Sequence, residues 1–546
     1  MNTRSYIEGK SNDSYTFFGN HKKTKDSYIF RNFAPNAKNV YLVGDFNDWN
    51  EEKLRKYSTG VFSKTIKNVK EFDKYLYVIE EYNGNKFYKL DPFAKLCDLE
   101  KEASMVYDKK YKFSYKFKEK ENLNIYQVHF ENLDEKIFEN RDELVKFIKY
   151  LKGNNFTHIN FMPIFSNRFK DNMDFSTSSF FALNEIFTSI ENFKLFIDLC
   201  HKNDIGIILD FDIGEFDSYN KSLIKYDGTN LYNYDYNDIL YNYHGSINFD
   251  PSKKITKSFI FSLITYWINE FNIDGIKFVN LENMIFWQGD KSRGYNENWI
   301  KFLKDINNHI NSLGKISIGS FLNLWEDDLD ENLGFSYIYD RTFSKIIKIM
   351  QKNPYERDNY SNYVENLICR NYDNYILGFD FSDSLSEGAS LCMKINSNDK
   401  KYQQLKTVFL LLYTLNSKKI IFLEDERGSL QTFDINRKID LYNLNDKELD
   451  FNQFYKKISK FYLENRNLCK KDSKTTILEI EGYSLYAFIR KYKKEKYLVL
   501  INLTDLDYKI DLNYKVEKKL TSFDGKYKED NKIKIPAFGS GIFRIK

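Results

Sequence analysis

Several acidic side chains lie where predicted strands end. Asp210 and Asp212 close one apolar run, Glu215 follows three residues later, and Asp380 stands near the end of another run. Carboxylates in unlike environments are the groups that proteins most often use for paired acid and base chemistry. Asp212, Glu215 and Asp380 could form such a pair. Solvated or hydrogen-bonded structural roles are the alternative, and we favour them.

The sequence shows no pattern of a metal or cofactor site. The six histidines have no metal-ligand spacing, and the five cysteines are single and odd in number. Scattered cysteines fit neither a disulfide framework nor a paired metal site. We therefore predict no cofactor and a reducing, cytoplasmic location. No window approaches the roughly 20 apolar residues of a membrane span, and residues 1–20 lack a signal-peptide core. We expect no membrane attachment and no export.

The positions of these carboxylates depend on the elements around them. From about Tyr28 to Tyr115, short runs such as residues 39–43 and 74–78 alternate apolar and polar side chains between Asn and Gly. This alternation is typical of half-buried strands. It predicts a small β-sandwich at the start of the chain.

After Asn124 the pattern changes to alternating strands and helices. Eight strands are predicted at residues 124–130, 158–164, 205–211, 275–280, 315–321, 335–339, 374–381 and 420–426. Helical periods fall at residues 191–204, 256–272, 296–313, 342–352, 402–416 and 452–465. Eight strands, each with a following helix, favour a (β/α)8 barrel over an open sheet. A long insertion, from Ile213 to about Lys257, follows the third strand at the end where such barrels place their active sites.

From Thr475 the chain returns to β texture, which predicts a second β-sandwich at the C-terminus. The expected domains are a sandwich at residues 1–118, a barrel at 119–472 and a second sandwich at 473–546. A length of 546 residues accommodates a barrel of about 250 residues with flanking modules. Lys plus Arg total 82 against 78 for Asp plus Glu, and the charges are interspersed. A nucleic-acid partner is therefore not indicated, and a neutral partner fits better.

Motifs in the first sandwich resemble the family-48 carbohydrate-binding module of glycogen branching enzymes. They are Phe33-Ala34-Pro35-Asn36-Ala37, Val43-Gly44-Asp45-Phe46-Asn47-Asp48-Trp49-Asn50 and Lys89-Leu90-Asp91-Pro92-Phe93-Ala94. The barrel is similar to the same enzymes of glycoside hydrolase family 13, through Phe161-Met162-Pro163-Ile164, Gly206-Ile207-Ile208-Leu209-Asp210 and Asp227-Gly228-Thr229. The resemblance runs in order along nearly the whole chain. It implies an α-amylase-like barrel and an α-glucan, glycogen or a starch-like polymer, as the partner.

The resemblance also implies a retaining transfer that needs three carboxylates. An aspartate attacks the anomeric carbon, a glutamate about 5 Å away acts as acid and base, and a second aspartate holds the distorted sugar. This sequence aligns Val279 with the nucleophile, Ser320 with the acid/base and Phe381 with the third carboxylate. Glu215 replaces the family's histidine after the third strand. Valine and phenylalanine can neither accept a glycosyl group nor transfer a proton.

Four residues remain as candidates for substrate binding. Asp210 aligns with a substrate-site aspartate, although it could simply cap a loop. Phe175 aligns with a sugar-stacking tyrosine, but packing is the alternative. Lys277 stands where the family has arginine. Trp49 is either a glucan platform or a ring buried between the sandwich sheets. Aromatic residues make up 17% of the chain, which suits sugar stacking but also results from an AT-rich genome.

Three functions are compatible with this sequence. The first is a non-catalytic α-glucan-binding protein that accompanies an active enzyme of glycogen metabolism. The second is an active 1,4-α-glucan branching enzyme with relocated or misaligned catalytic residues. The third is a barrel scaffold that no longer binds sugar. We favour the first, because the predicted fold is retained while all three aligned catalytic positions are substituted.

Overall fold

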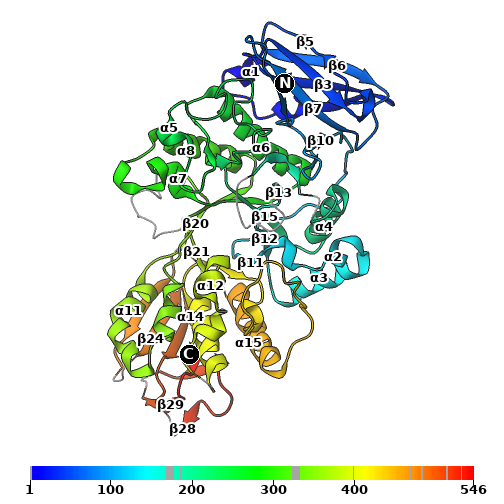
Figure 1. Cartoon of the computed structure of the whole chain (residues 1–546). Helices are drawn as coiled ribbons and strands as arrows, with labels where there is room; N and C mark the ends of the chain where they lie inside the picture. Colours follow the sequence, from blue (N-terminus) through cyan, green and yellow to red (C-terminus); the bar gives the residue numbers. More distant parts are fainter. Residues whose placement is uncertain are drawn as a thin grey trace.

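The computed structural model describes residues 3–167, 177–184, 187–321, 333–397, 399–465, 470, 472–480, 484–511, 514–529 and 532–546. Three bodies follow one another along the chain (Figure 1): an N-terminal β-sandwich, a central barrel with its helices, and a C-terminal β domain. The first helix, α1 (Thr3–Ile7), packs against α6 (Lys254–Phe271) of the barrel. Backbone N–H groups of Ser11 and Ser14 donate to the hydroxyls of Ser258 and Ser262 on that helix.

The N-terminal body is the predicted sandwich of two sheets. One sheet has the order β1-β2-β6-β5, and the other has β4-β3-β7-β10-β9 with β8 paired to β7. The strands are β1 (Gly19–Thr24), β2 (Ser27–Phe33), β3 (Asn39–Gly44), β4 (Glu52–Lys53), β5 (Arg55–Lys56), β6 (Val61–Lys67), β7 (Lys74–Glu80), β8 (Lys86–Lys89), β9 (Cys97–Asp98) and β10 (Ala103–Met105). Val40 and Leu42 alternate inward on β3 and pack against Tyr75 and Tyr77 of β7.

Eight parallel strands close into a barrel, which confirms the predicted fold class. In order around the barrel they are β11 (Asn124–Val128), β12 (His158–Phe161), β15 (Gly206–Phe211), β18 (Gly275–Phe278), β19 (Ile316–Ser320), β20 (Tyr337–Tyr339), β21 (Tyr375–Gly378) and β22 (Lys418–Phe422). Every predicted barrel strand overlaps one of them. The insertion after β15 contains β16 (Glu215–Phe216), α5 (Asn237–Leu240) and β17 (Ile247–Asn248).

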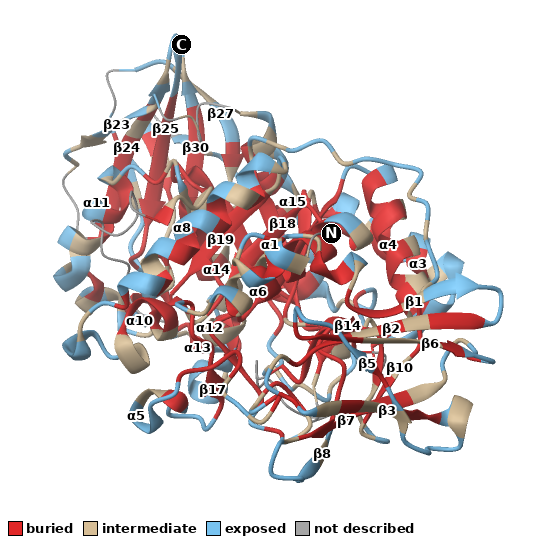
Figure 2. Ribbon diagram, turned by 90° about the horizontal axis from the view of Figure 1, so that it is seen from above, coloured by how far each residue is buried: buried red, intermediate tan, exposed pale blue. Residues whose placement is uncertain are grey.

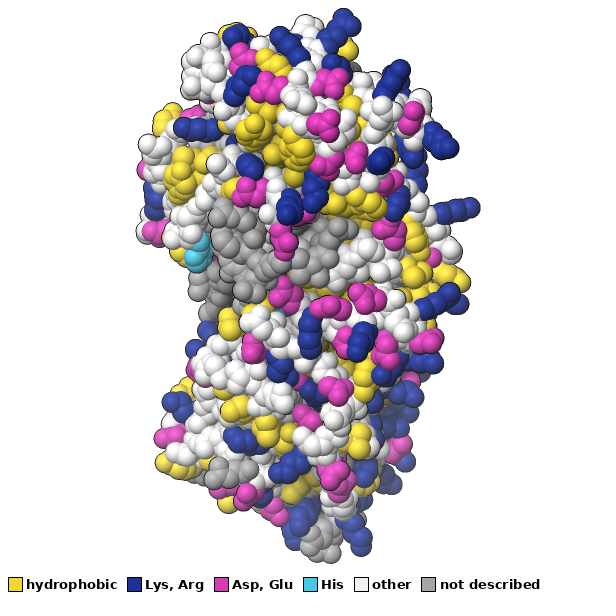
Figure 3. Space-filling view, turned by 45° about the vertical axis from the view of Figure 1, so that its right-hand side comes forward, with side chains coloured by type: hydrophobic (Ala, Val, Ile, Leu, Met, Phe, Trp, Pro, Cys, Tyr) yellow, Lys and Arg dark blue, Asp and Glu magenta, His cyan; other side chains and the backbone are white. Residues whose placement is uncertain are grey.

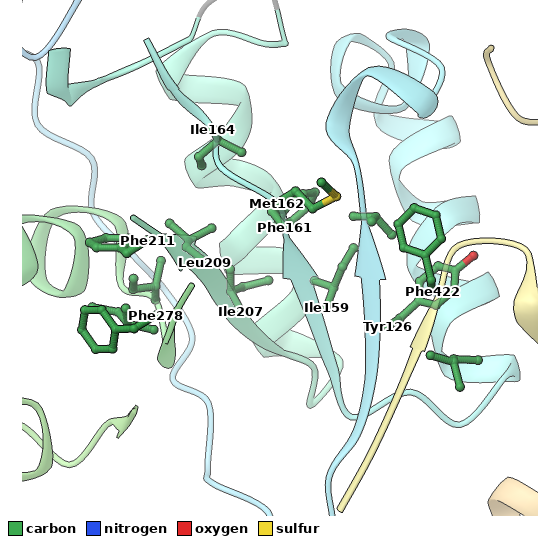
Figure 4. Packing of buried hydrophobic residues seen from close by; sticks show 14 of the residues in the cluster. Tyr126, Ile159, Phe161, Met162, Ile164, Ile207, Leu209, Phe211, Phe278 and Phe422 are labelled. Atoms are coloured by element: carbon green, nitrogen blue, oxygen red, sulfur yellow. The ribbon is translucent and has the colours of Figure 1, made fainter. Parts of the chain in front are cut away.

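Strand alternation decides which side chains face the barrel interior. Ile207 and Leu209 of β15 belong to the large apolar layer shared with the surrounding helices (Figure 4), whereas Ile208 belongs to a separate cluster inside the barrel. Successive side chains of a strand point to opposite faces. Asp210 therefore points into the barrel above Ile208, where its surroundings are polar side chains from neighbouring strands.

The main helices of the barrel are α3 (Arg141–Gly153), α4 (Ile190–Lys202), α6, α8 (Glu297–Ser312), α10 (Lys345–Met350), α11 (Ser361–Cys369), α14 (Lys401–Thr414) and α15 (Asp446–Glu464). The predicted helix at residues 452–465 begins too late. Asn445 caps α15, because its side chain accepts from the N–H of Glu448 while Glu448 accepts from the N–H of Asn445. This Asn-x-x-Glu capping box was the signal in the sequence for the earlier start.

The C-terminal body has a five-stranded sheet of order β23-β24-β25-β30-β27 and a three-stranded sheet of order β26-β29-β28. The strands are β23 (Lys474–Leu478), β24 (Leu485–Tyr492), β25 (Glu495–Asn502), β26 (Tyr508–Ile510), β27 (Val516–Thr521), β28 (Lys528–Glu529), β29 (Lys532–Ile535) and β30 (Ser540–Ile545). Figure 2 shows the central strands β25 and β30 buried along much of their length. Among the described helices, none is long and apolar enough to cross a membrane.

Candidate functional site

Asp210 lies at the centre of a buried polar layer near the C-terminal ends of the barrel strands. Its carboxylate accepts from Asn160 Nδ2 at 2.8 Å, from Lys277 Nζ at 3.2 Å and from Gln127 Nε2 at 3.3 Å. Strand register produces this arrangement, because Asp210 pairs with Lys277 across β15 and β18, and Gln127 pairs with Asn160 across β11 and β12.

This layer is closed to solvent. The side chains of Asp210 and Lys277 are 0% and 2% exposed. Burial raises the pKa of Asp210 above its ordinary value, and the charge of Lys277 acts in the opposite direction. Together the carboxylate of Asp210 and the ammonium of Lys277 form a buried ion pair. The structure thus brings together the two candidates Asp210 and Lys277, and they bind each other.

Val279 and Ser320 lie side by side at the ends of neighbouring strands. Phe278 of β18 pairs with Gly319 of β19, which places Val279 and Ser320 one residue further along. Val279 follows β18, is buried, and donates its N–H to the carbonyl of Phe211 at 3.0 Å. Ser320 is the buried last residue of β19. Neither position carries a carboxylate.

The third aligned position has a different local structure from the predicted one. Strand β21 ends at Gly378, and Phe381 is the first residue of α12 (Phe381–Leu385). The predicted strand, residues 374–381, is therefore too long at its C-terminal end. Since Asp380 and Phe381 both lie beyond the strand, strand alternation does not separate their side chains. Asp380 is buried and caps α12 by accepting from the N–H of Ser382 at 3.0 Å.

Arg341 holds three strand ends together. Its Nε donates to the carbonyl of Phe321, just after β19, at 2.9 Å. One terminal nitrogen donates to Asp380 at 2.6 Å and the other to the hydroxyl of Ser382. A planar guanidinium with several donors suits this bridging role better than an ammonium. The carboxylate of Asp380 thus forms an ion pair with Arg341 and caps the N-terminus of α12.

Asp383 is the second carboxylate of this region. Its Oδ2 accepts from the N–H of Asp380 at 3.0 Å, which completes a capping box on α12. Burial and, to a smaller extent, the charge of Asp380 raise the pKa of Asp383 to about 7. Asp380, paired with Arg341, and Asp383, only partly ionised at pH 7, are two carboxyl groups in unlike environments. Such a pair could divide acid and base work.

Comparisons with known proteins agree with the fold described above. The model of carbohydrate-binding module 48, the isoamylase N-terminal domain, matches residues 17–94. The model of the alpha-amylase SusG C-terminal domain matches residues 485–542. The 1,4-alpha-glucan branching enzyme GlgB of Bacillus anthracis is 27% identical over 100% of this chain and 94% of its own length. That of Bacillus cytotoxicus is 27% identical over 93% and 84%.

The chain is a homologue of the 1,4-alpha-glucan branching enzymes. Solved structures share its fold. The catalytic module of the glycogen-degrading pneumococcal virulence factor SpuA has a TM-score of 0.78 at 15% identity, covering 100% of this chain and 99% of that one. Pullulanase from Anoxybacillus sp. LM18-11, complexed with maltotetraose, has a TM-score of 0.78 at 14% identity, covering 99% and 89%.

In this branching-enzyme homologue the carboxylates after β15 are held by amide side chains. Asp212 accepts from Asn280 Nδ2 at 2.7 Å and from the N–H of Gly214 at 3.1 Å. Glu215 accepts from the amides of Asn242 and Asn283. Both are buried; Asp212 directly follows β15, and Glu215 begins β16. These contacts agree with the structural roles favoured from the sequence.

The remaining candidates lie in other parts of the homologue. Trp49 is 43% exposed, so its ring is not buried between the sheets, and its Nε1 donates to Asp45 at 3.0 Å. Phe175 lies outside the described residues. Asp227 of the insertion accepts from the N–H and the side-chain amide of Asn36, each at 3.0 Å. It therefore ties the insertion to the carbohydrate-binding module.

Sequence reasoning missed the partners that surround these groups. Gln127 and Asn160 lie in strands, where a polar residue at an inward position was the available signal. Arg341 follows β20 by two residues, and Asp383 follows Asp380 at capping-box spacing. Among the described residues, no group of three or more His, Cys, Asp or Glu is placed to hold a metal ion.

Proposed function

We propose that this branching-enzyme homologue binds an α-glucan without transferring or hydrolysing it. The observation that carries the proposal is the pair of residues at the ends of β18 and β19. Val279 and Ser320 are adjacent there, and both are buried. The retaining mechanism of the resembled family needs a nucleophile and an acid/base about 5 Å apart at this place. A valine side chain cannot form the glycosyl ester, and a serine hydroxyl is a poor nucleophile unless a base activates it.

The polar layer beneath these residues supports the same proposal. Asp210 is enclosed by Lys277, Asn160 and Gln127, and its side chain has no exposed surface. It therefore presents no carboxylate to a ligand in this conformation.

For glucan binding we propose Trp49 as one contact. Its ring is exposed on the module that matches carbohydrate-binding module 48. Exposed tryptophan rings offer a flat apolar face with a polar edge, which suits a glucose unit.

We further propose a cytoplasmic location and a role beside an active enzyme of glycogen metabolism. The scattered cysteines and the retained family fold support these two points.

Two measurements on the purified full chain test the proposal. Incubation with amylose, followed by iodine absorbance, is expected to show no change. Affinity electrophoresis in gels that contain glycogen is expected to show retarded migration. A fall in absorbance with new α-1,6 linkages would contradict the absence of transfer. Unretarded migration would contradict glucan binding and favour a scaffold that no longer binds sugar.

One observation favours a second function, an active branching enzyme that uses relocated residues. Asp380 and Asp383 lie on the C-terminal face of the barrel, and the pKa of Asp383 is raised to about 7. If this pair is catalytic, the wild-type chain lowers iodine absorbance and both Asp380→Asn and Asp383→Asn abolish the effect. We rank this function second, because the ion pair with Arg341 and the capping box already account for both carboxylates.

A further inference from the structure

A cavity of about 720 Å³ lies beside this carboxylate pair. Its walls come from α10 and the residues just before it, from α12, from the 3-10 turn η7 (Ser386–Gly388) and from α13 (Leu391–Lys394). Its charged lining residues are Arg341, Lys345, Lys348, Asp383, Glu387 and Lys394. A volume of this order accommodates a small organic ligand.

Positive charge gathers on one side of the cavity. Lys345 and Lys348 are exposed and three residues apart on α10, so they share one face of the helix. Within the described part of the chain, neither makes an ion pair or a hydrogen bond through its side chain. On the facing wall Lys394 is buried, and its ammonium donates to the carbonyl of Asp383 and to the hydroxyl of Ser386 at 2.9 Å.

The acidic groups of the cavity offset this charge only in part. Arg341 is already paired with Asp380 at 2.6 Å, so that pair is neutral. Of the two lining carboxylates, Glu387 accepts from Gln351 Nε2 at 2.6 Å. Asp383 is partly protonated near pH 7, since burial raises its pKa. The three lysines outnumber the two lining carboxylates, a balance that attracts an anion.

The rest of the cavity lining is mostly polar with a small apolar area, which suits a compact polar molecule. Ser344, Ser382 and Ser386 supply hydroxyls, and Ile347 and Leu391 supply a small apolar surface. Lysine ammonium groups bind phosphoryl oxygens as point charges. We propose that this cavity binds a phosphomonoester with a sugar-sized body, held at its phosphoryl group by Lys345 and Lys348. The inference does not depend on the proposed function.

The test measures binding of glucose 1-phosphate and glucose 6-phosphate to the full chain by calorimetry, with glucose as the uncharged comparison. The test variant is Lys345→Gln/Lys348→Gln. The matched control is Lys301→Gln/Lys304→Gln, which removes two exposed lysines at the same spacing on α8. Work at low ionic strength keeps the surface charges little screened. Circular dichroism establishes that both variants are folded.

At least one sugar phosphate is expected to bind the wild type and the control variant with equal affinity. The Lys345→Gln/Lys348→Gln variant is expected to bind about tenfold more weakly or not at all. The proposal is overturned if neither sugar phosphate binds the wild type. It is also overturned if the test variant binds as tightly as the control, or if glucose binds as tightly as its phosphates. Inorganic phosphate is the second comparison. If it binds as tightly as the sugar phosphates, the site recognises only the phosphoryl group, and the proposed recognition of the sugar body is overturned.

Discussion

Lys277 Nζ lies 3.2 Å from Asp210 Oδ2, and the two residues are register partners on adjacent strands inside the barrel. Both side chains are enclosed, so the pair neutralises charge within the core. In the resembled family the corresponding aspartate lies in the substrate site. Here the ammonium, the amides of Asn160 and Gln127, and the closed surroundings make it part of the barrel's interior.

Removal of Lys277 is expected to destabilise the barrel strongly. Lys277→Met keeps the side-chain volume but leaves Asp210 buried without its cation, which costs about 3–5 kcal/mol. The double variant Asp210→Asn/Lys277→Met removes both charges and is expected to recover most of that loss. Urea denaturation followed by tryptophan fluorescence measures the free energies of unfolding. Lys301→Met, at an exposed position of α8, is the control. Equal stability of the single variant and the wild type would contradict the ion pair.

Substitution of Trp49 is expected to weaken glycogen binding without unfolding the module. The ring is 43% exposed, so Trp49→Ala removes little core packing. Loss of one stacking contact of about 1–2 kcal/mol lowers the affinity roughly tenfold. Retardation in glycogen gels measures the effect. Tyr57→Ala is the matched control, because Tyr57 belongs to the same module and is 44% exposed. If both variants lose retardation equally, Trp49 is not a specific contact.

The raised pKa of Asp383 is expected to make the stability of the folded chain depend on pH. Its pKa is raised from 3.8 to about 7, so the folded chain binds more protons than the unfolded chain between these values. Stability attributable to this group therefore falls as pH rises from about 4 to about 7. Asp383→Asn keeps the oxygen that accepts from the N–H of Asp380 and removes the charge. The variant is expected to match the wild type near pH 4 and to melt a few degrees higher at pH 8.

Thermal melts of both proteins across this pH range measure the difference. Asp399→Asn, at an exposed position, is the control and is expected to change melting little at any pH. A constant difference between Asp383→Asn and the wild type at all pH values would show that the raised pKa does not contribute.

Gly378 is expected to be essential for barrel closure. It has a φ of +150°, and a Cβ built on it would lie 1.8 Å from the carbonyl oxygen of Ile420 on β22. Gly378→Ala is therefore expected to cost more than about 3 kcal/mol, because strand pairing there must open. Denaturation of soluble protein, or its loss on expression, measures this. Gly153→Ala is the control, since nothing lies within 4 Å of a Cβ at that position of α3. Normal stability of Gly378→Ala would contradict the close approach.

The sequence by itself determined the order of the three bodies and the eight barrel strands. The period-two alternation of strands and the 3.6-residue period of helices are local patterns. They can be recognised in the sequence without knowing which elements pack together. The same holds for Val279 and Ser320, whose placement at strand ends needed only the strand positions. Together with the family resemblance, these placements allowed the prediction, before any coordinates, that Val279 and Ser320 replace the family's nucleophile and acid/base.

Only the tertiary structure decided what the remaining polar residues do. Asp210 is bound by three side chains, those of Lys277, Asn160 and Gln127. These contacts depend on the register between strands that are far apart in the chain. Arg341 meets Asp380 and the carbonyl of Phe321 because the barrel brings three strand ends together. The exposure of Trp49 and the lysine-lined cavity likewise arise from packing between elements. Burial and charge pairing are properties of three-dimensional surroundings, so a linear pattern indicates which groups are present but not which groups meet.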